Sequence, residues 1–142
     1  MKEILKDFKV VTTIKARWSD MDAMRHINNV AYVTWGEIAR IDYFEVLGGF
    51  SSSPEKEPYA PILGFQSVKY IAPLTYPDTI FIGTKTDGIK EDRIILKSFF
   101  YSDKTKKIVA IKTHEVIIFN YKTNKKMVVP LAIIDRINAL EN

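Results

Sequence analysis

The hydrophobic pattern predicts one long helix in the first third of the chain. Of the eighteen residues from 30 to 47, twelve are apolar or aromatic, and at about 100° per residue they leave no broad polar face. A helix with this pattern is expected to be buried rather than to lie on a surface. Asn28 or Asn29 can cap its start and Gly48 can end it as a left-handed residue, so we predict a helix over residues 29–47.

Five runs of residues have the composition and spacing of strands. One precedes the helix and four follow it, separated by turn residues, so neighbours among these four should pair antiparallel. In the last run, imperfect alternation places Val109, Ile111, Ile117 and Phe119 on one side. A short helix is expected near residues 130–140. The five strands are predicted at residues 8–17, 62–72, 79–87, 93–101 and 108–121.

This order of elements favours an α+β fold, in which a curved antiparallel sheet of five strands wraps around one central helix. The chain has 142 residues and neither repeats nor a low-complexity linker, so residues 1–142 are expected to form a single domain. One interval, residues 48–61, collects glycine, serine and proline and reads as a loop. Its length suits a lid or an ordered arm.

Composition narrows the chemistry that this fold can carry. The chain has no cysteine, which excludes thiol catalysis, a disulfide scaffold and cysteine-bound zinc. Neither of its two histidines has a metal-ligand spacing with the other. We therefore expect no metal and no other cofactor.

Charge and hydropathy argue against nucleic-acid and membrane partners. The net charge of +4 is spread over the chain, and the lysine clusters at 104–107 and 122–126 fit solvated hairpin turns. No basic stripe with interleaved aromatic residues, as nucleic-acid binding requires, is visible. The sequence has no signal-peptide core and no run of about eighteen apolar residues that would cross a bilayer, so a cytoplasmic location is expected.

Polar side chains are concentrated just before the predicted helix. The eleven residues 19–29, SDMDAMRHINN, hold two aspartates, an arginine, a histidine and two asparagines. The longer stretch RWSDMDAMRHINNVAYVTWGEIARIDYF, together with the later VKYIAPLTYPDTIFI, resembles the hotdog-fold acyl-CoA thioesterases of the 4-hydroxybenzoyl-CoA thioesterase type. These enzymes share an Asp-x-Asp pattern, a turn that commonly reads Gly-His-Val-Asn-Asn, and a central helix with a Glu-x-x-Arg segment. The similarity spans roughly residues 8–121.

The resemblance implies hydrolysis of an acyl-CoA thioester by a homodimer or homotetramer. The catalytic aspartate of the family corresponds to Asp22, which can attack the thioester carbonyl or draw a proton from water. The family also implies that the backbone amide near Asn29 polarises the carbonyl, because first-turn N–H groups have no partner within a helix. Arg25 stands where the family commonly has glycine, and it can place a positive charge near the substrate.

Other residues in and after the cluster have two interpretations each. Asp20 either raises the pKa of a neighbouring carboxylate or accepts hydrogen bonds in the turn, and we favour the second. His26 either carries a proton or shapes the turn. Glu37 and Arg40, three residues apart, can form a buried ion pair at a subunit interface, although a helix carboxylate is catalytic in some hotdog enzymes. The resemblance suggests coenzyme A phosphate contacts at one strand turn, formed by Lys90, Arg93 and Lys97, which a solvated turn explains almost as well.

Three alternatives to an acyl-CoA thioesterase stay open at this point. One is a non-catalytic acyl-thioester-binding module on the same fold, whose site is closed by Arg25. Another is a hotdog hydratase, which needs an Asp and a His placed as a dyad. A third is a thioesterase that acts on acyl carrier protein instead of coenzyme A.

Overall fold

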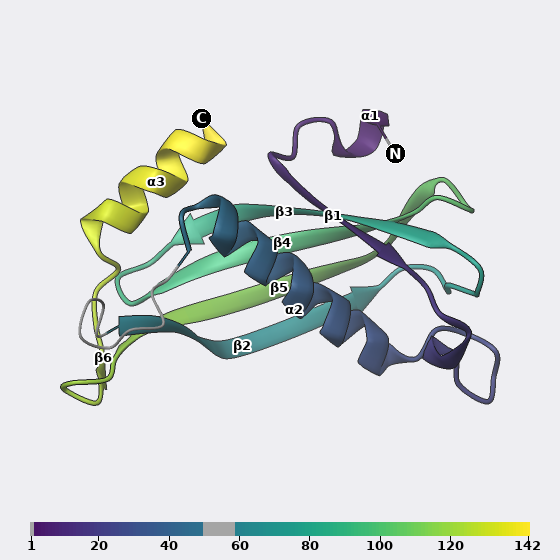
Figure 1. The fold of residues 1–142 in the computed structure, drawn as a ribbon, viewed down its shortest axis with the longest axis horizontal. Coiled ribbons are helices and arrows are strands. Elements are labelled where there is room, and N and C mark those ends of the chain that lie inside the picture. The colour runs from purple at the N-terminus through teal and green to yellow at the C-terminus, as the bar shows by residue number, and fades with distance from the viewer. Residues whose placement is uncertain (1, 50–58) are drawn as a thin grey trace.

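The computed structural model describes residues 2–49 and 59–142, which fold as one sheet with a long helix across it (Figure 1). The strands are β1 (Val10–Lys15), β2 (Tyr59–Tyr70), β3 (Thr79–Ile89), β4 (Arg93–Ser102), β5 (Lys107–Asn120) and the two-residue β6 (Lys125–Lys126). The helices are α1 (Lys2–Leu5), the 3₁₀ turn η1 (Trp18–Asp20), α2 (Asn29–Val46) and α3 (Leu131–Glu141).

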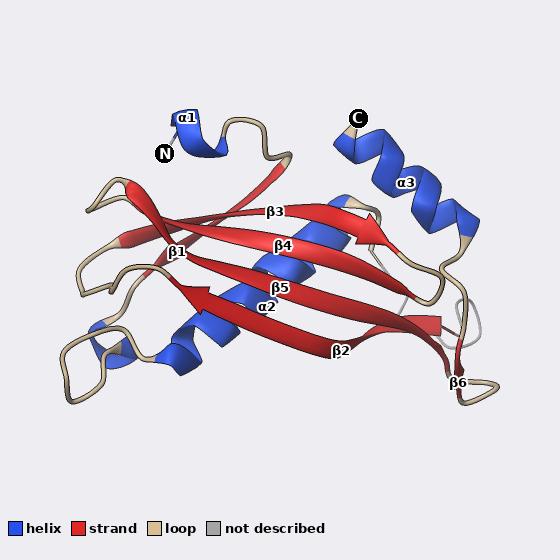
Figure 2. Ribbon diagram, turned by 180° about the vertical axis from the view of Figure 1, so that it is seen from behind, coloured by secondary structure: helices blue, strands red, loops and turns tan. Residues whose placement is uncertain are grey.

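All strand pairs are antiparallel, in the order β1-β3-β4-β5-β2, and β6 pairs with β5. Helix α2 lies against one face of the sheet, and α3 packs at one end (Figure 2). The predicted α+β fold with a five-stranded antiparallel sheet around a central helix is therefore confirmed, with β6 as a short addition. The lysine clusters lie in the β4–β5 and β5–β6 turns, as predicted.

Helix α2 begins and ends as its sequence predicts. The side chain of Asn28 accepts a hydrogen bond from the N–H of Val30, and Gly48 has a φ of +104° just after the helix. The apolar side chains divide the core into two clusters along the helix. Ala31, Tyr32, Trp35 and Ala39 pack on the sheet in one cluster, and Tyr43, Phe44 and Leu47 pack in the other, which α3 completes.

One face of α2 differs from the prediction of a helix buried on all sides. Val30, Ile38, Ile41 and Val46 are 41–63% exposed, because the sheet covers only the opposite face of the helix.

The sequence places Val109, Ile111, Ile117 and Phe119 on one side of β5, and the structure confirms this for all of them except Val109. The side of β5 that faces the core carries Ala110, Lys112, His114, Val116 and Ile118, all buried, whereas Ile111, Ile117 and Phe119 are half-buried on the other side. The pairing of β4 with β5 shifts register at Phe100/Tyr101. This shift leaves Val109 buried as well, on neither of the two alternating sets.

Of the loop predicted over residues 48–61, residues 50–58 lie outside the described part of the chain, and β2 begins at Tyr59. No helix among the described residues is long and apolar enough to cross a membrane.

Candidate active site

A tight turn connects η1 to the start of α2. Met21 and Ile27 pair as an isolated antiparallel bridge, and the N–H of Asp22 donates to the carbonyl of His26 at 2.9 Å. Within the turn, the N–H of Met24 donates to Asp22 Oδ1 at 2.9 Å. The other oxygen, Oδ2, accepts no hydrogen bond from the described residues, and the side chain is exposed. One oxygen of Asp22 thus shapes the turn, and the other is free for chemistry.

Backbone hydrogen bonds fix this turn to its surroundings. The N–H of Ile27 donates to the carbonyl of Leu74 at 2.8 Å, and the N–H of Asn28 donates to the carbonyl of Asp20 at 2.8 Å. These bonds hold the turn between η1 and the β2–β3 connection.

The first turn of α2 offers one free backbone donor. Asn28 Oδ1 accepts from the N–H of Val30 at 3.1 Å, and the N–H of Ala31 donates to the carbonyl of Asn28 at 3.0 Å. Among the described residues, the N–H of Asn29 has no acceptor. It lies at the positive end of the helix dipole, where developing negative charge is stabilised.

A cavity of about 360 Å³ opens beside this donor, lined by His26, Ile27, Asn29, Tyr32, Tyr70 and residues 71–74. Its wall is mostly apolar, and the rings of Tyr32 and Tyr70 meet edge to face at 5.0 Å. Burial, with a smaller effect of Tyr70, raises the pKa of Tyr32 to about 12, so this hydroxyl stays neutral. Asp22 does not line the cavity itself. His26 and Asn29, at either end of the same short segment, both do.

Asp20 has the structural role that we favoured. Its side chain is 7% exposed, and it accepts hydrogen bonds from the backbone N–H of Arg17 at 2.7 Å and from the guanidinium at 2.9 Å. Burial alone would raise the pKa of Asp20, but the hydrogen bonds from Arg17 hold it below its usual value. The two aspartates do not lie on one extended segment, because Asp20 is the last residue of η1, and each carboxylate has its own donors.

The sequence pattern of the thioesterase-like superfamily matches residues 16–137. The chain belongs to this superfamily. Thioester hydrolysis is accordingly the class of activity that its family membership supports.

Solved structures of similar fold include other thioesterases. A DHNA-CoA thioesterase from Staphylococcus aureus is 24% identical with a TM-score of 0.80, over 94% of this chain and 93% of that one. A thioesterase from Thermus thermophilus, complexed with coenzyme A and Zn, is 24% identical with a TM-score of 0.82, over 96% of each chain. The BH1999 gentisyl-coenzyme A thioesterase is 19% identical with a TM-score of 0.77, over 89% and 98%. A search of curated proteins found no match.

Arg25 explains how this superfamily member keeps the turn without glycine. Its φ is +61°, in the left-handed region that glycine enters without strain, and its N–H donates to the carbonyl of Asp22 at 3.0 Å. The turn therefore keeps the backbone conformation that a glycine would give.

Replacing Arg25 with glycine should stabilise the fold. A non-glycine residue in the left-handed region costs about 1–2 kcal/mol, from which the greater freedom of glycine in the unfolded chain subtracts about 0.4–1 kcal/mol. We expect the free energy of unfolding, measured by urea titration, to rise by about 0.5–1 kcal/mol. An Arg25→Ala variant, which keeps the strain, should show no such gain, and an equal gain in both variants would contradict this explanation.

Two of the three basic residues predicted to bind coenzyme A phosphates, Lys90 and Arg93, lie far from this cavity. Both flank the β3–β4 turn, at the end of the sheet where β2 begins, whereas the cavity adjoins Tyr70, where β2 ends (Figure 1). Lys97 lies further along β4, where Thr113 of β5 pairs with it and with Ser67 of β2. Eleven residue steps of strand separate the ends of β2, or roughly 35 Å. Within one chain, the fold thus separates Lys90 and Arg93 from the predicted catalytic residues.

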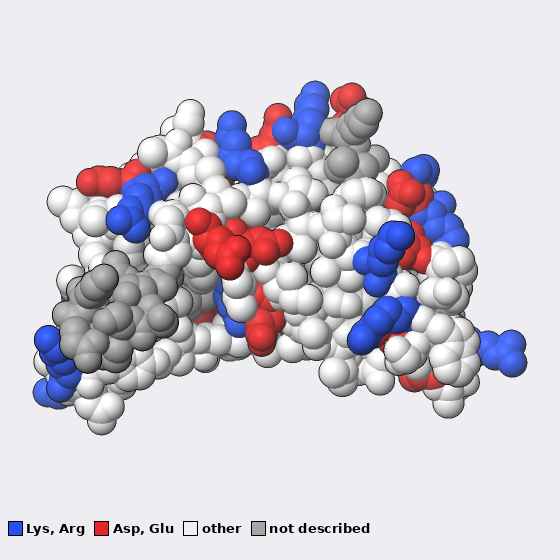
Figure 3. Space-filling view, in the orientation of Figure 1, with Lys and Arg blue, Asp and Glu red and all other residues white. Residues whose placement is uncertain are grey.

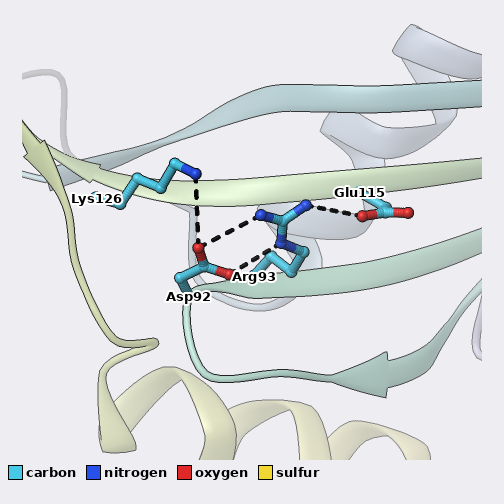
Figure 4. Close-up of polar contacts among 4 residues, drawn as sticks. All are labelled: Asp92, Arg93, Glu115 and Lys126. Atoms are coloured by element: carbon cyan, nitrogen blue, oxygen red, sulfur yellow. Dashed lines mark hydrogen bonds and ion pairs between the residues drawn. The ribbon is translucent and has the colours of Figure 1, made fainter.

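Arg93 is also held by two carboxylates (Figure 4). Its guanidinium donates to Asp92 Oδ1 at 2.9 Å and to Glu115 Oε1 at 2.9 Å, and Lys126 lies 4.0 Å from Asp92. The hydrogen bonds that Arg93 donates to these carboxylates raise its pKa above the usual value. Lys97 lies 3.7 Å from Asp87, and Lys90 forms no ion pair within the described chain.

The surface over α2 is acidic. Among the described residues, it offers no cationic site that could bind coenzyme A phosphates instead of the basic residues near the β3–β4 turn. Figure 3 shows acidic side chains gathered in the middle of this face, with Lys and Arg mostly toward its periphery. The acidic residues of α2 are Glu37, Asp42 and Glu45.

Sequence reasoning missed a buried polar network beneath α2. His114 is fully buried, with Nδ1 3.4 Å from Arg40 and Nε2 3.0 Å from Ser98 Oγ, and Ser98 Oγ lies 2.8 Å from Thr84 Oγ1. Burial, with smaller effects of Lys112 and Arg40, lowers the pKa of His114 to about 3. The imidazole is therefore neutral and accepts from Arg40 through Nδ1. The alternation of apolar and polar residues along β5 gives no sign that the side with His114 is the buried one.

The predicted pair of Glu37 and Arg40 forms only in part. The charged groups are 3.9 Å apart, and the Arg40 side chain is 13% exposed but that of Glu37 is 61% exposed. Burial lowers the pKa of Arg40, and Glu37 opposes that effect only weakly. The pair is thus not a buried ion pair within one chain.

Proposed function

We propose that this protein hydrolyses an acyl-CoA thioester to a free acid and coenzyme A. The observation that carries the proposal is that Asn29, whose backbone N–H has no acceptor among the described residues, lines a mostly apolar cavity and follows the unbonded carboxylate oxygen of Asp22 by seven residues. A carbonyl oxygen near this N–H would be polarised as it becomes anionic. The thiolate of coenzyme A leaves, and one water supplies the hydroxyl of the acid.

The carboxylate of Asp22 can act by either of two routes. It can attack the carbonyl and form an anhydride that water then hydrolyses, or it can take a proton from the water that attacks. Both routes need one unencumbered oxygen, which Oδ2 supplies. His26 lines the cavity and is placed to contact the acyl group or to shape the turn.

Two features favour hydrolysis over the alternatives. Arg25 keeps the turn in the conformation that glycine would give, which argues against a site closed by this residue. Asp22 and His26 share a backbone hydrogen bond but no side-chain hydrogen bond, which argues against the dyad that a hydratase requires. Incubation with a panel of acyl-CoAs and a thiol reagent tests the function: release of thiol supports it, and silence across the panel contradicts it.

Two copies of the chain are proposed to pair through β2. Among the described residues, this strand is a sheet edge that pairs only with β5, and it exposes Ile62, Phe65 and Tyr70. Unpaired edges of this kind favour strand addition. An antiparallel β2–β2 pair would also bring the β3–β4 turn of one copy to the end of the sheet where the cavity of the other lies. That arrangement would let Lys90 and Lys97 reach the phosphates of coenzyme A bound to the other copy.

The pairing predicts a particle of at least twice the 16.3 kDa of one chain. Sedimentation equilibrium at micromolar concentration measures this mass directly. A mass of one chain across the concentration range would contradict the pairing.

A further inference from the structure

Lys112 is a buried cation without a carboxylate partner in the described chain. It lies on the helix-facing side of β5 with a relative exposure of 0%, and it forms none of the salt bridges found among the described residues. Its Nζ donates to the backbone carbonyl of Val33, in the second turn of α2, at 3.1 Å. A buried ammonium held by a single neutral acceptor is costly.

Gly36 makes room for this lysine. A Cβ at position 36 would lie 2.8 Å from Lys112 Nζ and closer still to Cδ. The helix therefore approaches β5 closely at one point, where the lysine side chain passes under it. Lysine and glycine together form a specific attachment between α2 and the sheet.

The surroundings of Lys112 do not neutralise it. Arg40 and Glu37 face it from α2 and His114 from β5, while Ser98 stands opposite on β4. Burial, strengthened by Arg40 and opposed by Glu37, lowers the pKa of Lys112 to about 8. The ammonium is still largely protonated at neutral pH.

We infer that Lys112 is a positioning residue for the proposed active site: it holds the second turn of α2 on the sheet and thereby fixes the Asn29 N–H at the cavity. The inference rests on the proposed function. Val33 lies four residues after Asn29, or about 6 Å along the helix axis. Lys112 Nζ itself lies beside Gly36, seven residues or about 10 Å along the axis from Asn29. A positive charge about 12 Å from a developing oxyanion, at an effective dielectric constant near 20, favours it by about tenfold. The hydrogen bond to Val33 thus positions the Asn29 N–H, and the charge of Lys112 stabilises the oxyanion that this N–H would bind.

Substitution of Lys112 by methionine tests this role, because methionine keeps most of the volume and removes the charge. We expect kcat for acyl-CoA hydrolysis to fall about tenfold with KM within about twofold. Lys107→Met, an exposed lysine on the same strand, should leave both constants unchanged. Parent-like kcat in Lys112→Met would overturn the inference.

The pH dependence gives a second readout that a merely structural lysine would not move. In the parent protein, kcat should lose a factor of several as pH rises through about 8, because Lys112 loses its proton there. The Lys112→Met variant should lack this step. If the step persists in the variant, it belongs to another group and the inference fails.

Measurements of thermal stability distinguish a positioning role of Lys112 from a role in packing alone. The lowered pKa means that the unfolded chain binds more protons than the folded one between pH 8 and 10.5, so the stability of the parent should rise across this window. Below it, Lys112→Met should have a Tm equal to or higher than that of the parent. A lower Tm with unchanged kcat would show that Lys112 only packs, and would overturn the inference.

The Gly36→Ala substitution displaces the ammonium of Lys112 without removing its charge. Amide hydrogen exchange measures how firmly the start of α2 is held, and it needs no substrate. We expect kcat to fall in this variant too, and the amides of residues 30–33 to exchange faster in Gly36→Ala and Lys112→Met but not in Lys107→Met. Unchanged protection in the first two variants would overturn the inference. If the parent hydrolyses no acyl-CoA, the proposed function fails, while the exchange experiment still decides whether Lys112 holds the helix.

Discussion

Replacing Asp22 with asparagine should lower kcat for acyl-CoA hydrolysis by about 10²–10⁴-fold. Asparagine has the shape of aspartate, but it neither attacks a carbonyl nor takes a proton from water at neutral pH. Its Oδ1 can still accept the hydrogen bond that Met24 now donates at 2.9 Å. Because Asp22 is exposed, the free energy of unfolding should stay within about 0.5 kcal/mol of the parent.

Thiol release and urea unfolding, measured on the same preparations, check this expectation. Asp135→Asn is the matched control, since Asp135 is an exposed carboxylate on α3, outside the proposed site. It should behave as the parent in both measurements. Equal rates of thiol release by Asp22→Asn and the parent would remove Asp22 from the mechanism.

The elements near the proposed site could be predicted because several signals agree there. The apolar run, the Asn28 cap and Gly48 all mark the same helix, whose observed bounds, Asn29–Val46, differ from the predicted ones by one residue. The turn before it could be placed from its polar residues. Its backbone conformation could not, because Arg25 gives no local sign of a left-handed φ.

The local sequence pattern could not predict which side of β5 faces the helix, and the reason is physical. Apolar residues occupy consecutive positions at both ends of the strand, and each side also carries two polar residues, Lys112 and His114 on one and Thr113 and Glu115 on the other. Either side could therefore face the helix by hydrophobicity alone. The register with β2 and β4 decides the question, and that register is a property of the whole sheet. As a result of this register, the side of β5 that faces the helix buries a lysine and a histidine.

The basic residues of the β3–β4 turn show a similar limit. Their charge was plain in the sequence, but their distance from Asp22 depends on which end of the sheet each turn occupies. The carboxylates that hold Arg93 come from its neighbour Asp92 and from Glu115, 22 positions along the chain, and only the first was foreseeable. Association of two copies is what would make these residues relevant to the cavity.

Replacing Asn29 with proline should remove the proposed oxyanion donor and leave the helix intact. Proline lacks the backbone N–H and is well tolerated at the first position of a helix. The preceding residue, Asn28, has φ −65° and ψ 142°, which is the conformation that a residue before proline favours. Loss of one such donor costs about 3 kcal/mol of transition-state stabilisation, so kcat should fall by about 10²–10³-fold.

Asn29→Ala provides the comparison, because it removes the side chain from the cavity wall and keeps the N–H. Its kcat should stay within about tenfold of the parent, well above that of Asn29→Pro. Circular dichroism and urea unfolding should show that both variants keep the fold, since Asn28 still caps Val30. If the two variants lose the same activity, the side chain and not the backbone N–H of Asn29 matters, and the anionic oxygen must be stabilised elsewhere in the cavity.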